Sequence, residues 1–133
     1  RSVVGSVDVY KRQKVIYSTE HEKKITDRAK QYLRGGNGPM VGIELKSGIE
    51  AGKKFIESLK MFYHVANIGD ARSLAIHPAS TTHSQLNEKE LAASGVTQSY
   101  VRLCIGIEHI DDIIDDLDQA LNKSSKGSLK AVS

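Results

Sequence analysis

The sequence predicts an α/β fold, a small mixed or antiparallel sheet covered by helices on one face. Residues 40–45 and 100–105 alternate apolar side chains with others, as half-buried strands do. Residues 110–121 carry an apolar stripe at helical spacing, so a long one-sided helix follows the last strand. With 133 residues, the chain is long enough for one domain with a core and too short for two.

Composition narrows the class of protein. The 39% hydrophobic and 26% charged fractions are ordinary for a globular domain, and no apolar run approaches the roughly 20 residues of a membrane span. The net charge of +3 comes from lysines spread over helix faces and the C-terminal end, so we expect neither a nucleic-acid nor a membrane partner. The single cysteine excludes an internal disulfide and a cysteine-rich zinc site, and favours a cytoplasmic location.

The N-terminal third should contain an extension, a helix and a strand. Residues 1–13 have no clear partner and are predicted as an extension outside the domain, with at most a short strand at residues 6–10. Thr19 and Glu22 have the spacing of a capping box and predict a helix start. The apolar face of that helix consists of Ile25, Ala29, Tyr32 and Leu33. The glycines and proline of residues 35–39 end it, and residues 40–45 form the strand.

The central part of the chain should be a helix followed by short strands. Residues 49–59 have helical spacing, and Gly52 within them indicates close packing against a neighbouring element. Residues 62–66 and 73–76 are short apolar strands joined by a polar link, and a short helix opens at Asn87 and ends at Gly95.

The last strand and the last helix complete the domain, which we place at residues 14–122. In the strand, Val101, Leu103 and Ile105 face one way, and Tyr100, Arg102 and Cys104 the other. In the helix, Asp111, Asp112, Asp115 and Asp116 are interpreted as exposed charges that complement the helix dipole. Beyond residue 122 the composition turns to Lys, Ser and Gly, which predicts a flexible tail over residues 123–133.

Arg102 is the strongest candidate for a binding residue, because a guanidinium within an apolar strand needs an anion, and its planar fork suits a carboxylate or phosphate. An ion pair with a nearby acid is the alternative. His77 and His83 match no metal-ligand spacing and are expected to hydrogen-bond the loop backbone. The run from Ser80 to Thr82 lacks the surroundings of a nucleophile and should form a hydrogen-bonded turn. Cys104 could be activated by Arg102, but a small buried side chain is the favoured interpretation.

Five longer motifs carry a resemblance that spacing alone does not. They are FIESLK (55–60), ANIGDARSL (66–74), HPASTTHSQL (77–86), VRLCIGIE (101–108) and DDIIDDL (111–117). Together they resemble the C-terminal domain of the Cys/Met-metabolism (transsulfuration) family of pyridoxal-phosphate enzymes, and most closely its O-acetylhomoserine sulfhydrylase branch. The similarity runs over residues 14–122. Two positions depart from the family pattern, with Cys104 in place of serine and Tyr-Ser-Thr at residues 17–19 in place of Tyr-Pro-Gly.

The resemblance implies a fold-type I enzyme whose small C-terminal domain helps to close the active site. By motif position, Arg102 would bind the substrate α-carboxylate, Asn67 would line the same pocket, and Thr82 would support it. Pyridoxal 5′-phosphate and its Schiff-base lysine would belong to a large domain with no counterpart here, so this chain alone should be inactive. The implied reaction replaces the acetate of O-acetylhomoserine by sulfide, in a homotetramer. A cystathionine synthase or lyase type of enzyme, or a non-catalytic amino-acid-binding module, is the alternative.

Overall fold

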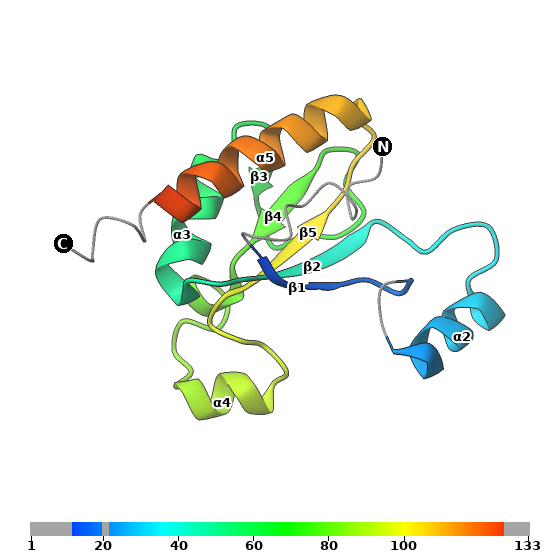
Figure 1. Ribbon diagram of the computed structural model, residues 1–133, viewed down its shortest axis with the longest axis horizontal. Coiled ribbons are helices and arrows are strands. Elements are labelled where there is room, and N and C mark those ends of the chain that lie inside the picture. The colour runs from blue at the N-terminus through cyan, green and yellow to red at the C-terminus, as the bar shows by residue number, and fades with distance from the viewer. Residues whose placement is uncertain (1–11, 20–21, 127–133) are drawn as a thin grey trace.

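The computed structural model describes residues 12–19 and 22–126, and five strands within them form one sheet in the order β1-β2-β5-β4-β3 (Figure 1). The strands are β1 (Arg12–Ile16), β2 (Met40–Leu45), β3 (Tyr63–His64), β4 (Leu74–Ile76) and β5 (Tyr100–Cys104). All neighbours are antiparallel except β3 and β4, which are parallel. The predicted mixed α/β sheet is therefore confirmed.

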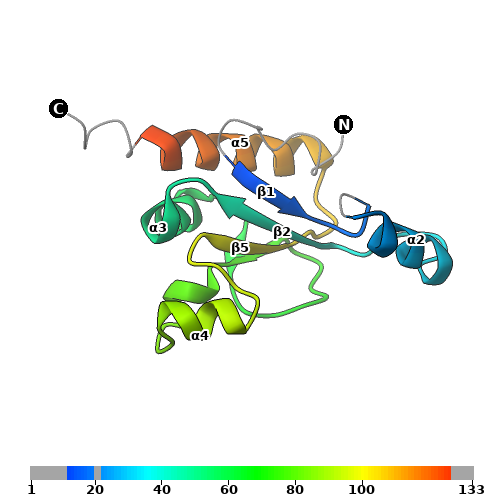
Figure 2. The same cartoon turned by 60° about the horizontal axis from the view of Figure 1, so that its bottom comes forward.

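Two helices cover one face of this sheet. The helices are α2 (Lys23–Tyr32), α3 (Gly48–Ser58), α4 (Glu88–Ala93) and α5 (Ile110–Lys126), with a 3-10 helix η1 (Pro78–Ser80) after β4. In Figure 2, α5 lies above the sheet and α3 lies at the left end of the sheet, whereas α4 lies below the sheet and α2 lies to the right. No helix among the described residues is long and apolar enough to cross a membrane.

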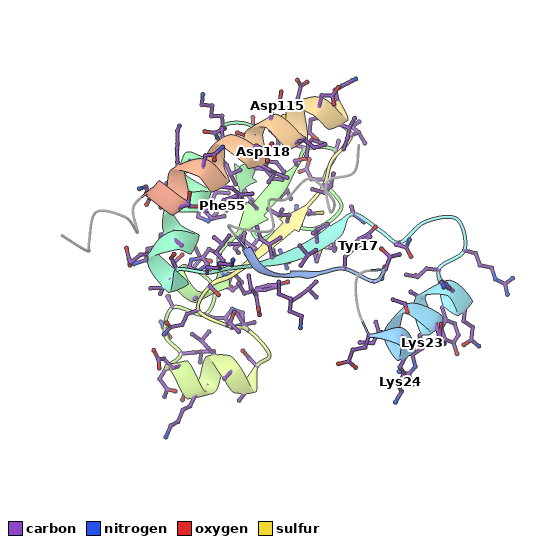
Figure 3. The ribbon with its side chains drawn as sticks, in the orientation of Figure 1. Tyr17, Lys23, Lys24, Phe55, Asp115 and Asp118 are labelled. Atoms are coloured by element: carbon purple, nitrogen blue, oxygen red, sulfur yellow. The ribbon has the colours of Figure 1, made fainter. Side chains whose placement is uncertain are left out.

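The core lies between the sheet and the α3–α5 pair. Val101 and Leu103 of β5 are fully buried in it, together with Phe55 of α3, which is labelled in Figure 3. The stripe of α5 faces the same core through Ile113, Ile114, Leu117, Ala120 and Leu121. The predicted strand alternation and helix stripe are both confirmed, because the large apolar side chains of each element point to this core. On the opposite face of the strands, Gly42 and Cys104 are also buried.

The N-terminal elements differ from the prediction. β1 begins at Arg12, inside the predicted extension, and pairs with β2. Its sequence, RQKVI, has too few apolar residues to show an alternation, because it is an edge strand with one neighbour. The strand expected at residues 6–10 lies outside the described residues.

Helix α2 forms as predicted, but it starts late and stays exposed. Its N-cap is Glu22, without a capping hydrogen bond from the side chain, and Thr19 lies in a turn four residues before the first helical residue. The prediction of a capping box formed by Thr19 and Glu22 is therefore wrong. The helix buries only Ala29, and the other apolar residues of its face, Ile25, Tyr32 and Leu33, are 39%, 72% and 45% exposed.

At the other end, α5 continues four residues past the predicted limit at residue 122. Ser124 is buried, and its hydroxyl donates to the Leu121 carbonyl (2.9 Å), so the last turn packs although its composition is polar. Residues 127–133 of the predicted tail lie outside the described residues. The division into extension, domain and tail otherwise stays a prediction.

Asp116 is buried, which corrects its interpretation as an exposed, dipole-complementing charge. Its carboxylate accepts hydrogen bonds from the backbone N–H groups of Lys60 (2.9 Å) and Met61 (2.8 Å). The segment that follows α3 is thereby attached to α5. Asp112 and Asp115 are exposed as predicted.

Gly52 packs against the ring of His77, which confirms the predicted close contact. A Cβ atom at Gly52 would lie 2.7 Å from Cδ2 and 2.8 Å from Cε1 of that ring, closer than carbon atoms approach. Helix α3 can therefore lie against the end of β4 only with a glycine at this position.

Replacing Gly52 with alanine is expected to lower the free energy of unfolding by roughly 1–3 kcal/mol, as overpacking does. The displaced His77 ring would also strain its two hydrogen bonds, which outweighs the gain of about 1 kcal/mol in helix propensity. Urea denaturation measures the change. The matched control is Gly36→Ala, at a position where a Cβ meets no atom and φ is ordinary. Equal midpoints for the two variants would contradict the packing.

Candidate functional site

Arg102 lies on β5, where it pairs with Gly42 of β2 on one side and Ile76 of β4 on the other. Because Val101 and Leu103 point to the helix-covered face, Arg102 points to the opposite face together with Tyr100. Arg102 is half-buried there. A rigid central strand thus carries a cation on the face that α3 and α5 leave uncovered.

Arg102 lines a hollow of about 310 Å³ between β2, β5 and the turn after β1. Polar groups around it come from Tyr17, Ser18, Asn37 and Tyr100. The Tyr100 ring lies across Gly42, where a Cβ atom would come within 2.6 Å of the ring, so glycine leaves the room that the ring needs. The Tyr17 hydroxyl donates to the Gly38 carbonyl (3.0 Å) and fixes one wall.

Among the described residues, the guanidinium forms one hydrogen bond, from Nη2 to the carbonyl of Asn67 at 3.3 Å. None of the ion pairs among the described residues involves Arg102. The alternative, an ion pair with a nearby acid, is therefore not formed within the described part of the chain. Most of the five N–H donors of an arginine therefore remain available to an anion in the hollow.

The neighbouring groups suit the same ligand. Burial raises the pKa of Tyr100, against the opposing effect of Arg102, so its hydroxyl keeps its proton. The Ser18 hydroxyl oxygen is buried and has no hydrogen-bond partner in the described part of the chain. A half-buried guanidinium with neutral hydroxyls beside it can bind and orient a carboxylate.

The two other predicted site residues, Asn67 and Thr82, are exposed rather than half-buried. Asn67 is exposed, its side-chain oxygen accepts from the N–H of Ile68 (2.9 Å), and its carbonyl faces Arg102. Thr82 is exposed, and its hydroxyl lies 2.8 Å from Nδ1 of His83. The structure thus brings Arg102 and Asn67 together, but no hydrogen bond among the described residues joins Thr82 to them. The roles of all three in binding stay predictions.

His77 is buried, and its two ring nitrogens are both occupied. Nδ1 lies 2.9 Å from the Ser80 hydroxyl, and Nε2 lies 2.7 Å from the Gln98 carbonyl, so Nε2 carries the proton. Burial lowers the pKa of His77, which keeps the ring neutral. The predicted structural role is confirmed for this histidine, and the Thr81 hydroxyl donates to its carbonyl (2.9 Å), as expected of a hydrogen-bonded turn. Across the described ranges, no three acidic, histidine or cysteine side chains form a metal site.

Cys104 is buried, as its favoured interpretation requires.

Sequence reasoning missed a cluster formed by Ser73 and Glu108. The Glu108 carboxylate accepts from the Ser73 N–H (2.6 Å) and the Ser73 hydroxyl (2.8 Å). Burial acts to raise the pKa of Glu108, but hydrogen bonds from Ser73 and from the backbone N–H of Glu108 together outweigh it and lower that pKa. The two residues are 35 positions apart and share no local pattern, so only the strand register could have paired them.

The fold and this site define an α/β domain with a half-buried arginine beside a small hollow, on the face of a mixed sheet that α3 and α5 leave uncovered. Residues 9–122 match the model of the Cys/Met metabolism PLP-dependent enzyme family, and the chain belongs to that family. The match begins within the segment predicted as an extension. It confirms the resemblance drawn from the five motifs.

Individual relatives agree with this family. The chain is 53% identical over 100 residues to an O-acetyl-L-homoserine sulfhydrylase of Leptospira meyeri, covering 75% of this chain and 23% of the relative. It is 52% identical over 95 residues to O-acetyl-L-homoserine sulfhydrylase 1 of Thermus thermophilus, with 71% and 23% covered. A solved structure of a putative O-acetylhomoserine (thiol)-lyase of Campylobacter jejuni, with N′-pyridoxyl-lysine-5′-monophosphate, matches with a TM-score of 0.80 and 36% identity, over 90% of this chain and 29% of that chain. The chain spans about a quarter of the length of these relatives.

The described residues do not fit covalent attachment of pyridoxal phosphate. Every lysine whose side chain is described is exposed, and none lines the hollow beside Arg102. An amine that reacts with this cofactor needs a shaped, desolvated pocket. Within the described residues, no lysine is therefore placed to hold the cofactor.

Proposed function

We propose that the full-length protein is a pyridoxal-phosphate-dependent O-acetyl-L-homoserine sulfhydrylase, and that this chain binds the substrate α-carboxylate. In the reaction, the Cγ–O bond of O-acetyl-L-homoserine breaks, acetate leaves, and sulfide forms the C–S bond of homocysteine. The single observation that carries the proposal for this chain is the half-buried Arg102, which lines a hollow with no acidic side chain among its described lining residues. Identities near 50% to sulfhydrylases support the choice of reaction.

The chain's own part in this reaction is binding and orientation. The guanidinium of Arg102 would take both carboxylate oxygens in a bidentate pair, which fixes the amino acid in one orientation. The Asn67 carbonyl would hold the guanidinium, and Thr82 would support the same pocket. The cofactor, which supplies the electron sink when bound, would be held mainly by the remainder of the protein. We also propose a cytoplasmic homotetramer.

The test uses the full-length protein loaded with pyridoxal phosphate. Homocysteine release is measured with O-acetyl-L-homoserine and sulfide, and 2-oxobutanoate release with L-cystathionine or L-methionine. The proposal predicts homocysteine as the main product at saturating substrate. Faster release of 2-oxobutanoate would assign the protein to the lyase type instead. No turnover of any of these substrates, with the cofactor bound, would favour an amino-acid-binding module.

The chain alone, mixed with pyridoxal phosphate, is expected to give no turnover above the rate of the free cofactor. The reason is that its described lysines are exposed and lie outside the Arg102 hollow. Borohydride reduction followed by peptide mass mapping should show scattered lysine labelling. Labelling at a single lysine, accompanied by turnover, would contradict this expectation.

A further inference from the structure

We propose that Glu108 is a positioning residue, which fixes the loop of residues 67–73 to the end of β5 and thereby sets where the Arg102 guanidinium lies. The inference deepens the proposed function and rests on it, because it assumes that Arg102 binds the substrate carboxylate. Glu108 itself would not touch the substrate.

The contacts of Glu108 join two chain segments that both lead to Arg102. Its two carboxylate oxygens accept from the N–H and the hydroxyl of Ser73, at 2.6 and 2.8 Å. The Ser73 hydroxyl oxygen in turn accepts from the N–H of Gly106 (2.9 Å). Ser73 is fully buried, whereas the Glu108 side chain is half-buried, so the cluster has its serine end inside the fold.

The backbones of the two segments also meet directly. The N–H of Ile107 donates to the carbonyl of Ala71 (2.9 Å). A Cβ atom at Gly106 would collide with that carbonyl and, at 2.5 Å, with the Glu108 carboxylate, so only glycine allows this approach. The loop is thus attached at Ala71 and Ser73, while its apolar residue Ile68 is 59% exposed and contributes little packing.

The attached loop carries the sole described acceptor of Arg102. The bond from Arg102 Nη2 to the Asn67 carbonyl is long, at 3.3 Å, so a small displacement of the loop would remove it. Arg102 lies on the same strand that leads into Gly106 and Glu108. The carboxylate of Glu108 therefore holds both the strand end and the loop between which the guanidinium is placed.

The experiment measures inhibition of the full-length holoenzyme by L-homoserine and by 3-amino-1-propanol, which is the same molecule without the carboxylate. The quantity of interest is the ratio of their inhibition constants, because it reports recognition of the carboxylate alone. Glu108→Gln is expected to raise the inhibition constant of L-homoserine about fivefold to tenfold, since it removes the charge that Ser73 binds. The constant of 3-amino-1-propanol should stay within about twofold, and KM should change more than kcat.

The matched control is Asp112→Asn, which makes the same kind of change at an exposed carboxylate on α5. It should leave the ratio unchanged. Glu108→Asp, which keeps the charge with a shorter reach, should fall between wild type and Glu108→Gln. If Glu108→Gln does not fold, Ser73→Ala removes the hydroxyl link and should shift the ratio in the same direction.

The Arg102→Ala variant distinguishes failure of the positioning role of Glu108 from failure of the carboxylate-binding role of Arg102. Suppose that Arg102→Ala no longer prefers L-homoserine to 3-amino-1-propanol, while the folded Glu108 and Ser73 variants keep the wild-type ratio of inhibition constants. That result would overturn the positioning role and leave the proposed function standing. An unchanged ratio in Arg102→Ala would overturn the carboxylate role of Arg102 itself. A fall in melting temperature of Glu108→Gln without any change in the ratio would assign Glu108 to stability only.

Discussion

Replacing Arg102 with lysine in the full-length enzyme is expected to lower kcat/KM about tenfold to a hundredfold, because a hydrogen bond to a charged group contributes roughly 1.5–3 kcal/mol. Lysine keeps the positive charge and loses the planar fork that suits two carboxylate oxygens. Arg102→Ala should be worse, since it removes the charge as well. The melting temperature should barely move, because Arg102 has only one long hydrogen bond within the described chain.

The control for this prediction is Arg28→Lys, at an exposed position of α2. It should leave both kinetics and melting unchanged. Normal kinetics together with a lowered melting temperature in Arg102→Lys would give the residue a structural role instead of a binding role.

Replacing Asp116 with alanine is expected to lower the free energy of unfolding by about 2–6 kcal/mol. Two backbone N–H groups, of Lys60 and Met61, would lose their acceptor at a part-buried position, and each such loss costs roughly 1–3 kcal/mol. The side-chain amide of Gln119 would lose a further partner at 2.9 Å. Chemical denaturation of the variant and the wild type measures the difference.

The neighbouring residue provides the control. Asp115 is exposed on the outer side of α5, where Figure 3 labels it, and Asp115→Ala should change the stability by less than about 0.5 kcal/mol. Equal losses at the two positions would mean that the effect comes from the helix dipole rather than from the buried contact.

Local periodicity was enough to predict the elements that bury one face. The strands β2 and β5 alternate, and α5 carries a stripe, because the core lies on one side of each. The same reasoning failed for β1, whose edge position leaves few buried side chains to mark it. It also failed for the environment of α2, because an amphipathic pattern identifies a helix without identifying what covers its apolar face.

The site was predictable only in part. Arg102 stands out because it interrupts an apolar strand, and the alternation correctly placed it on the face opposite Val101. Its contact with Asn67 and the pairing of Ser73 with Glu108 each span 35 positions, so they depend on how β4 and β5 are aligned. The burial of Asp116 likewise depends on α3 ending beside α5, which no local pattern encodes.

A crystal structure of the full-length holoenzyme with L-homoserine bound tests the central claim most directly. The predicted result places both oxygens of the α-carboxylate about 2.7–3.2 Å from two nitrogens of the Arg102 guanidinium. A carboxylate held by other groups, with Arg102 bonded only to the Asn67 carbonyl, would contradict the account.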